Sequence, residues 1–282
     1  MTTKNADLTI RFWGTRGSLP SPGAETSLHG GNTSCVEVWA GDKLLILDAG
    51  SGLRALGNHL KKRQPIEAHL LLSHYHWDHI MGLPFFAPIY LPDNKIHIYG
   101  ESRNGKDVLE ILSNQTIQPY FPVSIKTHGK ATTSVQPFSP GQTTEVGGVE
   151  VTACRLNHPG NALAYRLDYG GRSLVYATDT EPDPALDAQL AELAMGADAL
   201  VYDATYTDKE YEDHVGWGHS TWQVGSSIAK KAGVGKLILF HHLPERSDQD
   251  LALIEKAAKD ELSSTIAARE GMTLSFPSKK SS

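Results

Sequence analysis

Short apolar runs alternate with segments of helical periodicity along most of this chain. The predicted strands cover residues 35–40, 43–49, 68–73, 95–99, 149–156, 162–169, 173–178, 199–203, 236–240 and 273–276. The predicted helices cover residues 53–63, 106–115, 184–195, 221–232 and 250–262. Such an alternation of strands and helices is typical of an α/β protein built in layers.

Two turn signals and one long polar segment interrupt this pattern. Gly41-Asp42 predicts a tight hairpin, and Gly170-Gly171 predicts a second turn between two strands. In contrast, Thr116–Thr144 is polar, contains prolines and shows no clear period. Connections of that length are uncommon inside compact domains and are often functional. We therefore expect this segment to be a loop that covers a ligand.

Six of the apolar runs end in a histidine or an aspartate. In chain order these residues are Asp48, His74, His158, Asp179, Asp203 and His241. A polar residue can simply mark the point where a strand stops, and this explanation suffices for any single run. In sheets with covered faces, however, the loops at the carboxyl ends of strands converge on one crevice. Six such endings favour a shared site.

The strongest local signal is the run S-H-Y-H-W-D-H, residues Ser73 to His79. His74, His76 and Asp78 alternate and would face one way on an extended segment, and His79 reaches a neighbouring site if a helix begins at Asp78. Imidazole and carboxylate together suit Zn, Mn or Fe. The competing explanation is a solvated, histidine-rich loop. A zinc-protease helix is not supported, because the sequence contains no H-E-x-x-H.

Composition and charge narrow the class of protein. The 282 residues allow one large domain or two small ones, and the net charge of −6 argues against a protein that coats nucleic acid. Cys35 and Cys154 lie in strand-like runs, where buried thiols are expected. No apolar window is long enough to span a bilayer, and the N-terminal sequence has no apolar core of a secretory signal. We expect a soluble, cytoplasmic protein.

The run H-x-H-x-D-H after an apolar strand resembles the signature of the metallo-β-lactamase superfamily of metal hydrolases. The remaining strand-end residues also follow that superfamily's order, and the resemblance extends from about Phe12 to His242. It implies a four-layer αββα sandwich, in which two mixed sheets face each other and helices cover the outside. It also implies a single domain over residues 1–282, with similar halves at about 1–147 and 148–276.

The same resemblance implies two metal sites with a shared ligand. One metal would be held by His74, His76 and His158, and the other by Asp78, His79 and His241. Asp179 would bridge the two metals, and Asp48 would hold the histidine cluster by hydrogen bonding. His242, the neighbour of His241, is the alternative ligand for the second metal. We expect His241 because it follows the apolar run L-I-L-F directly.

Two further motifs indicate the branch of the superfamily. Y-D-A-T-Y at 202–206 and W-G-H-S-T at 217–221 resemble the H-E-A-T and G-H-S-T pair of ribonuclease Z and its phosphodiesterase relatives. In that group the histidine of G-H-S-T contacts the scissile phosphate and donates a proton, oriented by the acidic residue. These would be His219 and Asp203 here, with Asp where the group often has Glu. The alternative role of His219 is structural, next to a helix N-cap at Ser220.

Other features separate the remaining branches. Neither cysteine lies where metallo-β-lactamases place their cysteine ligand. His158 and Asp179 are separated only by the predicted hairpin, which leaves no room for the arm with which ribonuclease Z grips tRNA. The glycine-rich stretches 12–23 and 30–38 resemble the N-terminal part of small bacterial phosphodiesterases, including some that act on cyclic nucleotides.

The prediction is therefore a dinuclear metal-dependent phosphodiesterase for a small phosphodiester, with cyclic nucleotides favoured. A metal-activated water would attack, Asp78 would accept its proton, and His219 would protonate the leaving group with the help of Asp203. We expect two divalent ions, Zn or Mn before Fe, and neither an extended nucleic-acid surface nor a membrane partner. The resemblance also implies a homodimer. The alternatives are a ribonuclease Z-like nuclease for RNA ends and a non-catalytic, metal-binding sensory module.

Overall fold

Two seven-stranded sheets lie face to face in the computed structural model, which describes residues 7–279. In spatial order, the first sheet contains β14 (Thr273–Phe276), β1 (Leu8–Gly14), β2 (Cys35–Ala40), β3 (Lys43–Leu47), β4 (Glu67–Leu71), β5 (Lys95–Gly100) and β6 (Thr132–Pro137). The second contains β13 (Ile266–Ala267), β12 (Leu237–Phe240), β11 (Ala199–Asp203), β10 (Arg172–Ala177), β9 (Ala162–Tyr169), β8 (Val149–Leu156) and β7 (Thr143–Val146). Both sheets combine antiparallel and parallel pairings, so both are mixed.

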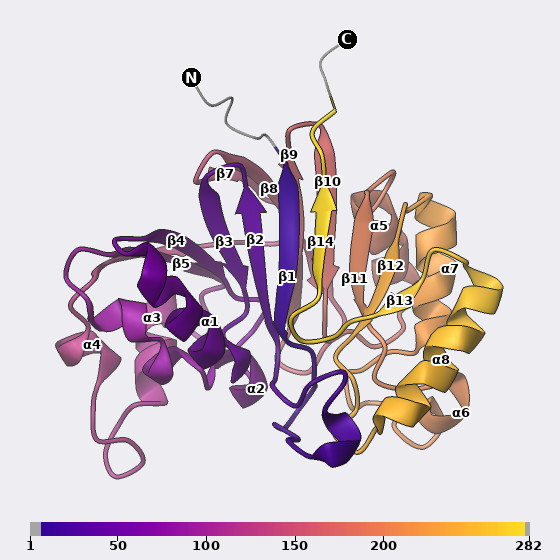
Figure 1. Ribbon diagram of the computed structural model, residues 1–282, viewed down its shortest axis with the longest axis horizontal. Helices are drawn as coiled ribbons and strands as arrows, with labels where there is room; N and C mark the ends of the chain where they lie inside the picture. The colour runs from indigo at the N-terminus through magenta and orange to yellow at the C-terminus, as the bar shows by residue number, and fades with distance from the viewer. Residues whose placement is uncertain (1–6, 280–282) are drawn as a thin grey trace.

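Helices cover the outer faces of the two sheets. They are α1 (Gly52–Leu60), α2 (Trp77–Ile80), α3 (Val108–Asn114), α4 (Ile125–His128), α5 (Pro184–Leu193), α6 (Asp208–Tyr211), α7 (Trp222–Ala232) and α8 (Asp248–Glu261). Helices α1 and α3 lie on the side of the first sheet, and α5, α7 and α8 on the side of the second (Figure 1). The predicted four-layer αββα sandwich is confirmed.

The main core lies between the two sheets. Residues of β1 alternate between buried and half-buried positions, with Ile10 and Phe12 in the buried set. From the opposite sheet Tyr176 and Phe240 join the same buried cluster. Two further clusters pack each sheet against its own helices. Burial on both faces explains why strands such as β3 and β12 are continuous apolar runs.

The largest difference between the predicted and the observed elements lies in Thr116–Thr144. The expected loop instead contains α4, the whole edge strand β6 and the start of β7. Strand β6 pairs with β5 but leaves most of its side chains half-buried or exposed, so its sequence lacks a strand-like apolar pattern. The strand β1 was not predicted either. The predicted strands and helices elsewhere are present, with ends shifted by a few residues.

The two sheets do not divide the chain strictly at residue 147. Strand β7 precedes that point and lies in the second sheet, whereas the C-terminal β14 returns to pair with β1 in the first. None of the helices formed by residues 7–279 combines the length and apolar character that a bilayer-spanning segment needs. Residues 1–6 and 280–282 lie outside the described part. The expectation that the N-terminal sequence has no secretory signal therefore falls partly on residues that the structure does not describe.

Candidate metal centre

The predicted strand-end residues meet at one end of the sandwich, where α2 lies (Figure 1). Asp48 follows β3, His74 lies three residues after β4, and His241 follows β12 directly. Asp48, Asp179 and His241 have φ angles of 60°, 51° and 57°, in the left-handed region that non-glycine residues rarely adopt. Such strain persists only where the surrounding structure enforces it, and it concentrates at functional sites.

The short helix α2 separates the histidine-rich run into two groups. His76 has an extended backbone and caps α2, which then places Asp78 and His79 in buried positions. The helix begins at Trp77, one residue before Asp78, where the sequence analysis placed the start of a helix. As a result, His74 and His76 face one group of side chains, and Asp78 and His79 face another.

The first ligand group consists of His74, His76, His158 and Asp179. His158 Nε2 lies 2.9 Å from His76 Nδ1 and 3.8 Å from Asp179 Oδ2. His74 Nε2 lies 3.6 Å from the same carboxylate oxygen. A tetrahedral ion with bonds of about 2.0–2.2 Å would hold its ligand atoms roughly 3.3–3.6 Å apart. The spacing of the group is close to that requirement.

The second ligand group consists of Asp78, His79, Asp179 and His241. His79 Nε2 and His241 Nε2 each lie 3.2 Å from Asp78 Oδ2 and 3.2 Å from Asp179 Oδ1, and they are 3.4 Å from each other. Asp179 thus turns Oδ2 toward the first group and Oδ1 toward the second. This is the position of a bridging carboxylate.

Hydrogen bonds on the far side of the imidazoles show that the cluster fits a metal. His79 Nδ1 lies 2.8 Å from Asp48 Oδ2, and His158 Nδ1 lies 2.7 Å from the carbonyl oxygen of Gly218. Because these acceptors fix the proton on Nδ1, the Nε2 lone pairs point into the cluster. His74 Nε2 is buried and has no hydrogen-bond partner among residues 7–279. Unprotonated nitrogens aimed at carboxylates need a cation between them.

Electrostatics support the same conclusion. Burial alone disfavours charge on His79, but the carboxylates of Asp179, Asp78 and Asp48 raise its pKa well above the usual value. Burial likewise disfavours charge on Asp179, but the imidazoles of His241, His79 and His74 hold its pKa well below the usual value. The buried carboxylates therefore create a strong demand for positive charge, which divalent ions would satisfy.

Asp48 lies behind the cluster and organises it. This fully buried carboxylate accepts hydrogen bonds from the Ser73 backbone N–H at 2.7 Å and from the hydroxyls of Ser73 and Tyr176, each at 2.8 Å. Together with His79 Nδ1, these donors fix both oxygens. Asp48 thus contacts the outer nitrogen of His79 and is not itself a member of either ligand group.

The adjacent histidines His241 and His242 point in different directions. His242 Nε2 lies 2.9 Å from the carbonyl oxygen of Ala268, on the side away from the cluster. Burial lowers the pKa of His242 to about 3, so its ring is neutral. In contrast, His241 Nδ1 lies 3.1 Å from the hydroxyl of Thr205, which leaves Nε2 for the second ligand group. The geometry therefore favours His241 over His242.

His219 and Asp203 form a pair beside the second ligand group. His219 Nδ1 lies 3.0 Å from Asp203 Oδ2, so the aspartate reaches the imidazole although it is shorter than the glutamate that the related motif often has. The ring stacks on His241 at 4.8 Å between centroids and approaches Asp179 Oδ2 at 4.0 Å. Burial opposes its charge, but Asp203 outweighs this and raises the pKa of His219 to about 9. Asp203 thus favours the protonated form of this imidazole.

Comparison with known proteins identifies the family. Residues 44–242 match the β-lactamase superfamily domain. The chain belongs to this superfamily. Ribonuclease Z from Methanosarcina acetivorans is 25% identical over 96% of this chain and 98% of its own. Within the superfamily, the chain is similar to ribonuclease Z along most of its length.

Solved structures agree with this assignment at the level of the fold. The metallo-β-lactamase fold protein YhfI from Bacillus subtilis matches with a TM-score of 0.75 and 23% identity, over 96% of this chain and 100% of that one. The short form of human tRNase Z matches with a TM-score of 0.64 and 20% identity, over 95% and 99%. These superfamily neighbours share the two facing sheets and outer helices.

Two contacts of the superfamily site were not predicted from the sequence. The backbone N–H of Ser18 donates to Asp78 Oδ2 at 2.7 Å. Next to it, a Cβ on Gly17 would lie 2.3 Å from the ring of His241, so only glycine fits there. The segment G-T-R-G-S lies in the glycine-rich stretch 12–23. Glycine allows another group to approach the backbone closely, so this stretch was a signal for the contact. The hydroxyl of Thr205, which supports His241, belongs to the Y-D-A-T-Y motif, but the motif alone assigned it no role.

A pocket of about 440 Å³, here called the front pocket, opens onto the two ligand groups. It is lined by Ser18, Tyr75, His76, Trp77, Asp78, Asp179 and His219. These residues include members of both groups and the candidate proton donor. No residue of Thr116–Thr144 lines this pocket, so the segment does not act as the expected cover in this structure.

Proposed function

We propose that the protein is a dinuclear metal-dependent phosphodiesterase that hydrolyses a small phosphodiester, with cyclic nucleotides as the favoured class. The observation that carries the proposal is the pair of His219 and Asp203 beside the doubled ligand cluster. A structural metal site needs ligands but no proton donor. A protonated imidazole aimed at the same pocket is what a departing alkoxide requires.

The ligand assignment follows the geometry. The first metal would be held by His74, His76 and His158, the second by Asp78, His79 and His241, and Asp179 would bridge them. When bound, two divalent ions activate water and offset the charge of the phosphate oxygens. Histidine and carboxylate ligands suit Zn and Mn, with Fe as a further option.

The chain's own residues supply the proton transfers. The described contacts of Asp78 all fall on Oδ2, so Oδ1 accepts no hydrogen bond from residues 7–279 and is available to accept the proton of the attacking water. His219 donates a proton to the leaving oxygen from the other side of the front pocket. Asp203, which also accepts hydrogen bonds from Thr205 and Thr180, stays in place and restores the orientation of His219.

The short connection between His158 and Asp179 favours a small substrate. Only the hairpin of β9 and β10 lies between them, so no long arm projects from this part of the fold. The net charge of −6 also offers no general attraction to a polyanion. The names of the relatives nevertheless favour a second candidate, a nuclease of the ribonuclease Z type.

The experiment that tests the proposal compares kcat/KM over a substrate panel. Metal-loaded protein is assayed with Mn or Zn on 3′,5′- and 2′,3′-cyclic nucleotides, bis(p-nitrophenyl) phosphate, an RNA with a 3′ trailer, a thioester and a cephalosporin. We expect the highest kcat/KM on a cyclic nucleotide. The highest value on the trailer RNA supports the nuclease instead, and the highest value on the thioester or cephalosporin rejects phosphodiester hydrolysis. No turnover of any substrate favours the sensory module.

A further inference from the structure

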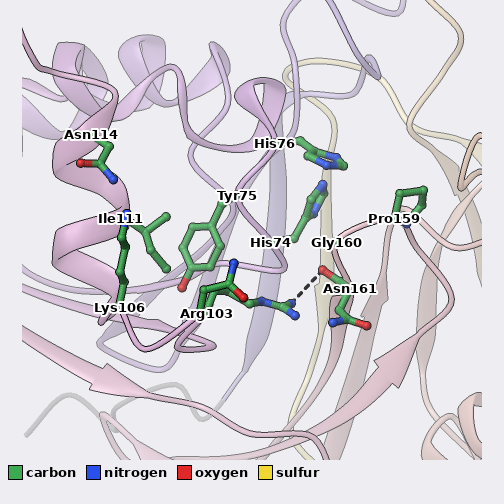
Figure 2. Close-up of a pocket in the computed structure, with 11 residues that line it drawn as sticks. His74, Tyr75, His76, Arg103, Lys106, Ile111, Asn114, Pro159, Gly160 and Asn161 are labelled. Carbon is green, nitrogen blue, oxygen red and sulfur yellow. Dashed lines mark hydrogen bonds between the residues drawn. The ribbon is translucent and has the colours of Figure 1, made fainter.

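A second cavity, of about 330 Å³, lies beside the first ligand group and is here called the side cavity. Its walls come from His74–His76, from residues 103–106, from α3 and from residues 159–161. Figure 2 shows His74 and His76 on one side of this cavity, Lys106 and Asn114 on the side of α3, and Tyr75 between them. The mechanism proposed above does not use it.

The side cavity adjoins the front pocket. Tyr75 and His76 line both, and His74 and His76 belong to the first ligand group. A substrate whose scissile phosphate faces the cluster can therefore extend a second group past Tyr75 into the side cavity. The chemistry of this wall then decides which group is accepted.

One wall carries more cations than carboxylates. Arg103 pairs with Glu101 at 2.8 Å, but the same carboxylate also pairs with Arg155, so two guanidinium groups share one negative charge. Arg103 Nη2 donates to the carbonyl oxygen of Asn161 at 2.8 Å (Figure 2). Its Nε is buried and has no hydrogen-bond partner in the part of the chain that the structure describes. The wall thus has a net positive charge and a spare donor.

Lys106 adds a further cation. Its side chain forms no ion pair with any acid among residues 7–279. The nearby Asp107 and Glu110 are occupied with each other in the capping box of α3, where each side chain accepts the backbone N–H of the other. The ammonium group is therefore free to bind an anion.

The remaining polar groups on the wall are amides. Asn104 and Asn161 have φ angles of 51° and 66°, and Gly105 and Gly160 next to them are also left-handed. Two strained loops thus hold amide side chains at the cavity, and Asn114 adds a third from α3. No carboxylate lines the side cavity. Amides and cations without a carboxylate are the donor set of an anion site.

From this wall we propose that the side cavity binds a second phosphate carried by the same substrate. The proposal rests on the proposed function and narrows it, because the preferred small diester then carries a further phosphate in addition to the one that is hydrolysed. A charge-assisted contact of this kind contributes roughly 10- to 100-fold in binding.

The test compares two substrates that differ only in the second phosphate. Wild-type protein is assayed on 2′,3′-cyclic AMP with and without a 5′-phosphate, and we expect kcat/KM to be about 10- to 100-fold higher with it. Lys106→Gln should remove most of this preference and leave kcat/KM on bis(p-nitrophenyl) phosphate within about 2-fold. Lys126→Gln, at an exposed lysine of α4, is the matched control and should keep the preference. Equal kcat/KM on the two nucleotides, or a preference that survives Lys106→Gln, overturns the proposal.

A binding measurement separates this proposal from the proposed function. Calorimetry of metal-loaded protein with adenosine 3′,5′-bisphosphate and with adenosine 3′-monophosphate needs no turnover. We expect the bisphosphate to bind about 10-fold more tightly, and Lys106→Gln to abolish that difference. If neither cyclic nucleotide is hydrolysed, the proposed function fails and calorimetry alone decides the cavity. Equal affinities for the two nucleotides then reject the side cavity as a phosphate site.

Discussion

The two ligand groups differ in how firmly the protein holds them. All members of the second group are buried, and its two imidazoles are fixed from behind by the side chains of Asp48 and Thr205. In the first group His76 is exposed, and the outer nitrogens of His74 and His158 are anchored by the hydroxyl of Ser73 and by the carbonyl oxygen of Gly218. The first group also borders both cavities.

This difference indicates that the two metal sites of the cluster differ in how tightly they bind metal. Ligands locked by buried hydrogen bonds are held in one geometry and bind tightly. Ligands at the rim can adjust, and they meet the substrate. We therefore expect the second site to retain its metal more strongly, and the first site to exchange its metal more readily. The following predictions test this contrast.

Asp179→Ala should have the largest effect, because it removes the one residue that joins the two groups. We expect loss of metal from both sites and a fall in kcat/KM on bis(p-nitrophenyl) phosphate of roughly 10⁴-fold. Elemental analysis of protein purified without chelator measures the metal, with wild type expected to approach two ions per chain. A variant that keeps one tightly bound metal and full activity would contradict the bridging role.

His219→Ala should impair turnover without disturbing either group. His219 stacks on His241 but is not one of the assigned ligands, so we expect metal content to stay at the wild-type level. The loss in kcat on a nucleotide should be about 10²- to 10⁴-fold, the usual contribution of a general acid. An aryl diester needs less protonation of its leaving group and should lose less. Small and equal losses on both substrates would assign His219 a structural role only.

Asp48→Asn should act mainly on the second group, because Asp48 contacts His79 directly and reaches His74 of the first group only through the hydroxyl of Ser73. Asparagine tolerates the left-handed backbone at this position but offers a single acceptor oxygen to four donors, including His79. We expect the affinity of the second site to fall about 10- to 100-fold, as for other groups that orient a metal ligand. Titration with a chelator, followed by metal analysis, measures it. In wild type the first metal should leave first, whereas in the variant the two should leave together.

The sequence allowed much of this centre to be anticipated. Residues at strand ends, such as Asp179 and His241, could be assigned to one crevice because the layered pattern fixed where the strands stop. The alternation of His74 and His76 with Asp78, and the turn that redirects His79, follow from local backbone periodicity. These features depend on short-range order, which a single sequence records well.

Features that depend on distant contacts could not be read in this way. Ser18 reaches Asp78 through a backbone N–H, which carries no side-chain signature. Strand β6 forms because β5 offers an open edge, not because its own residues are apolar. The side cavity likewise brings together residues 103–106 and 159–161, and only the fold shows that they are neighbours.

The smallest effect is expected from a change at Glu210, which holds Arg246 and, through Arg246 and Thr205, supports His241 of the second group. Arg246 donates to the carbonyl oxygen of Thr205, whose hydroxyl contacts His241, and pairs with both oxygens of Glu210 at 2.7 and 2.8 Å. The hydrogen bonds from Arg246 lower the pKa of Glu210 from 4.5 to about 2. Glu210 therefore stabilises the fold above about pH 4.5, and this contribution is lost as the pH falls toward about 2.

Glu210→Gln should lower the free energy of unfolding at pH 7 by about 0.5–1 kcal/mol, since the carboxylate is about one-third exposed and solvent screens the pair. At pH 3 the difference from wild type should be smaller, because protonation already favours the unfolded chain. Urea unfolding of both proteins at the two pH values measures this, with Glu192→Gln as a control at an exposed glutamate without an ion pair among residues 7–279. Metal affinity of the second site should fall by less than in Asp48→Asn, because Thr205 itself remains in contact with His241. An effect on stability that is equal at pH 3 and pH 7 would mean that Glu210 acts through packing and not through its charge.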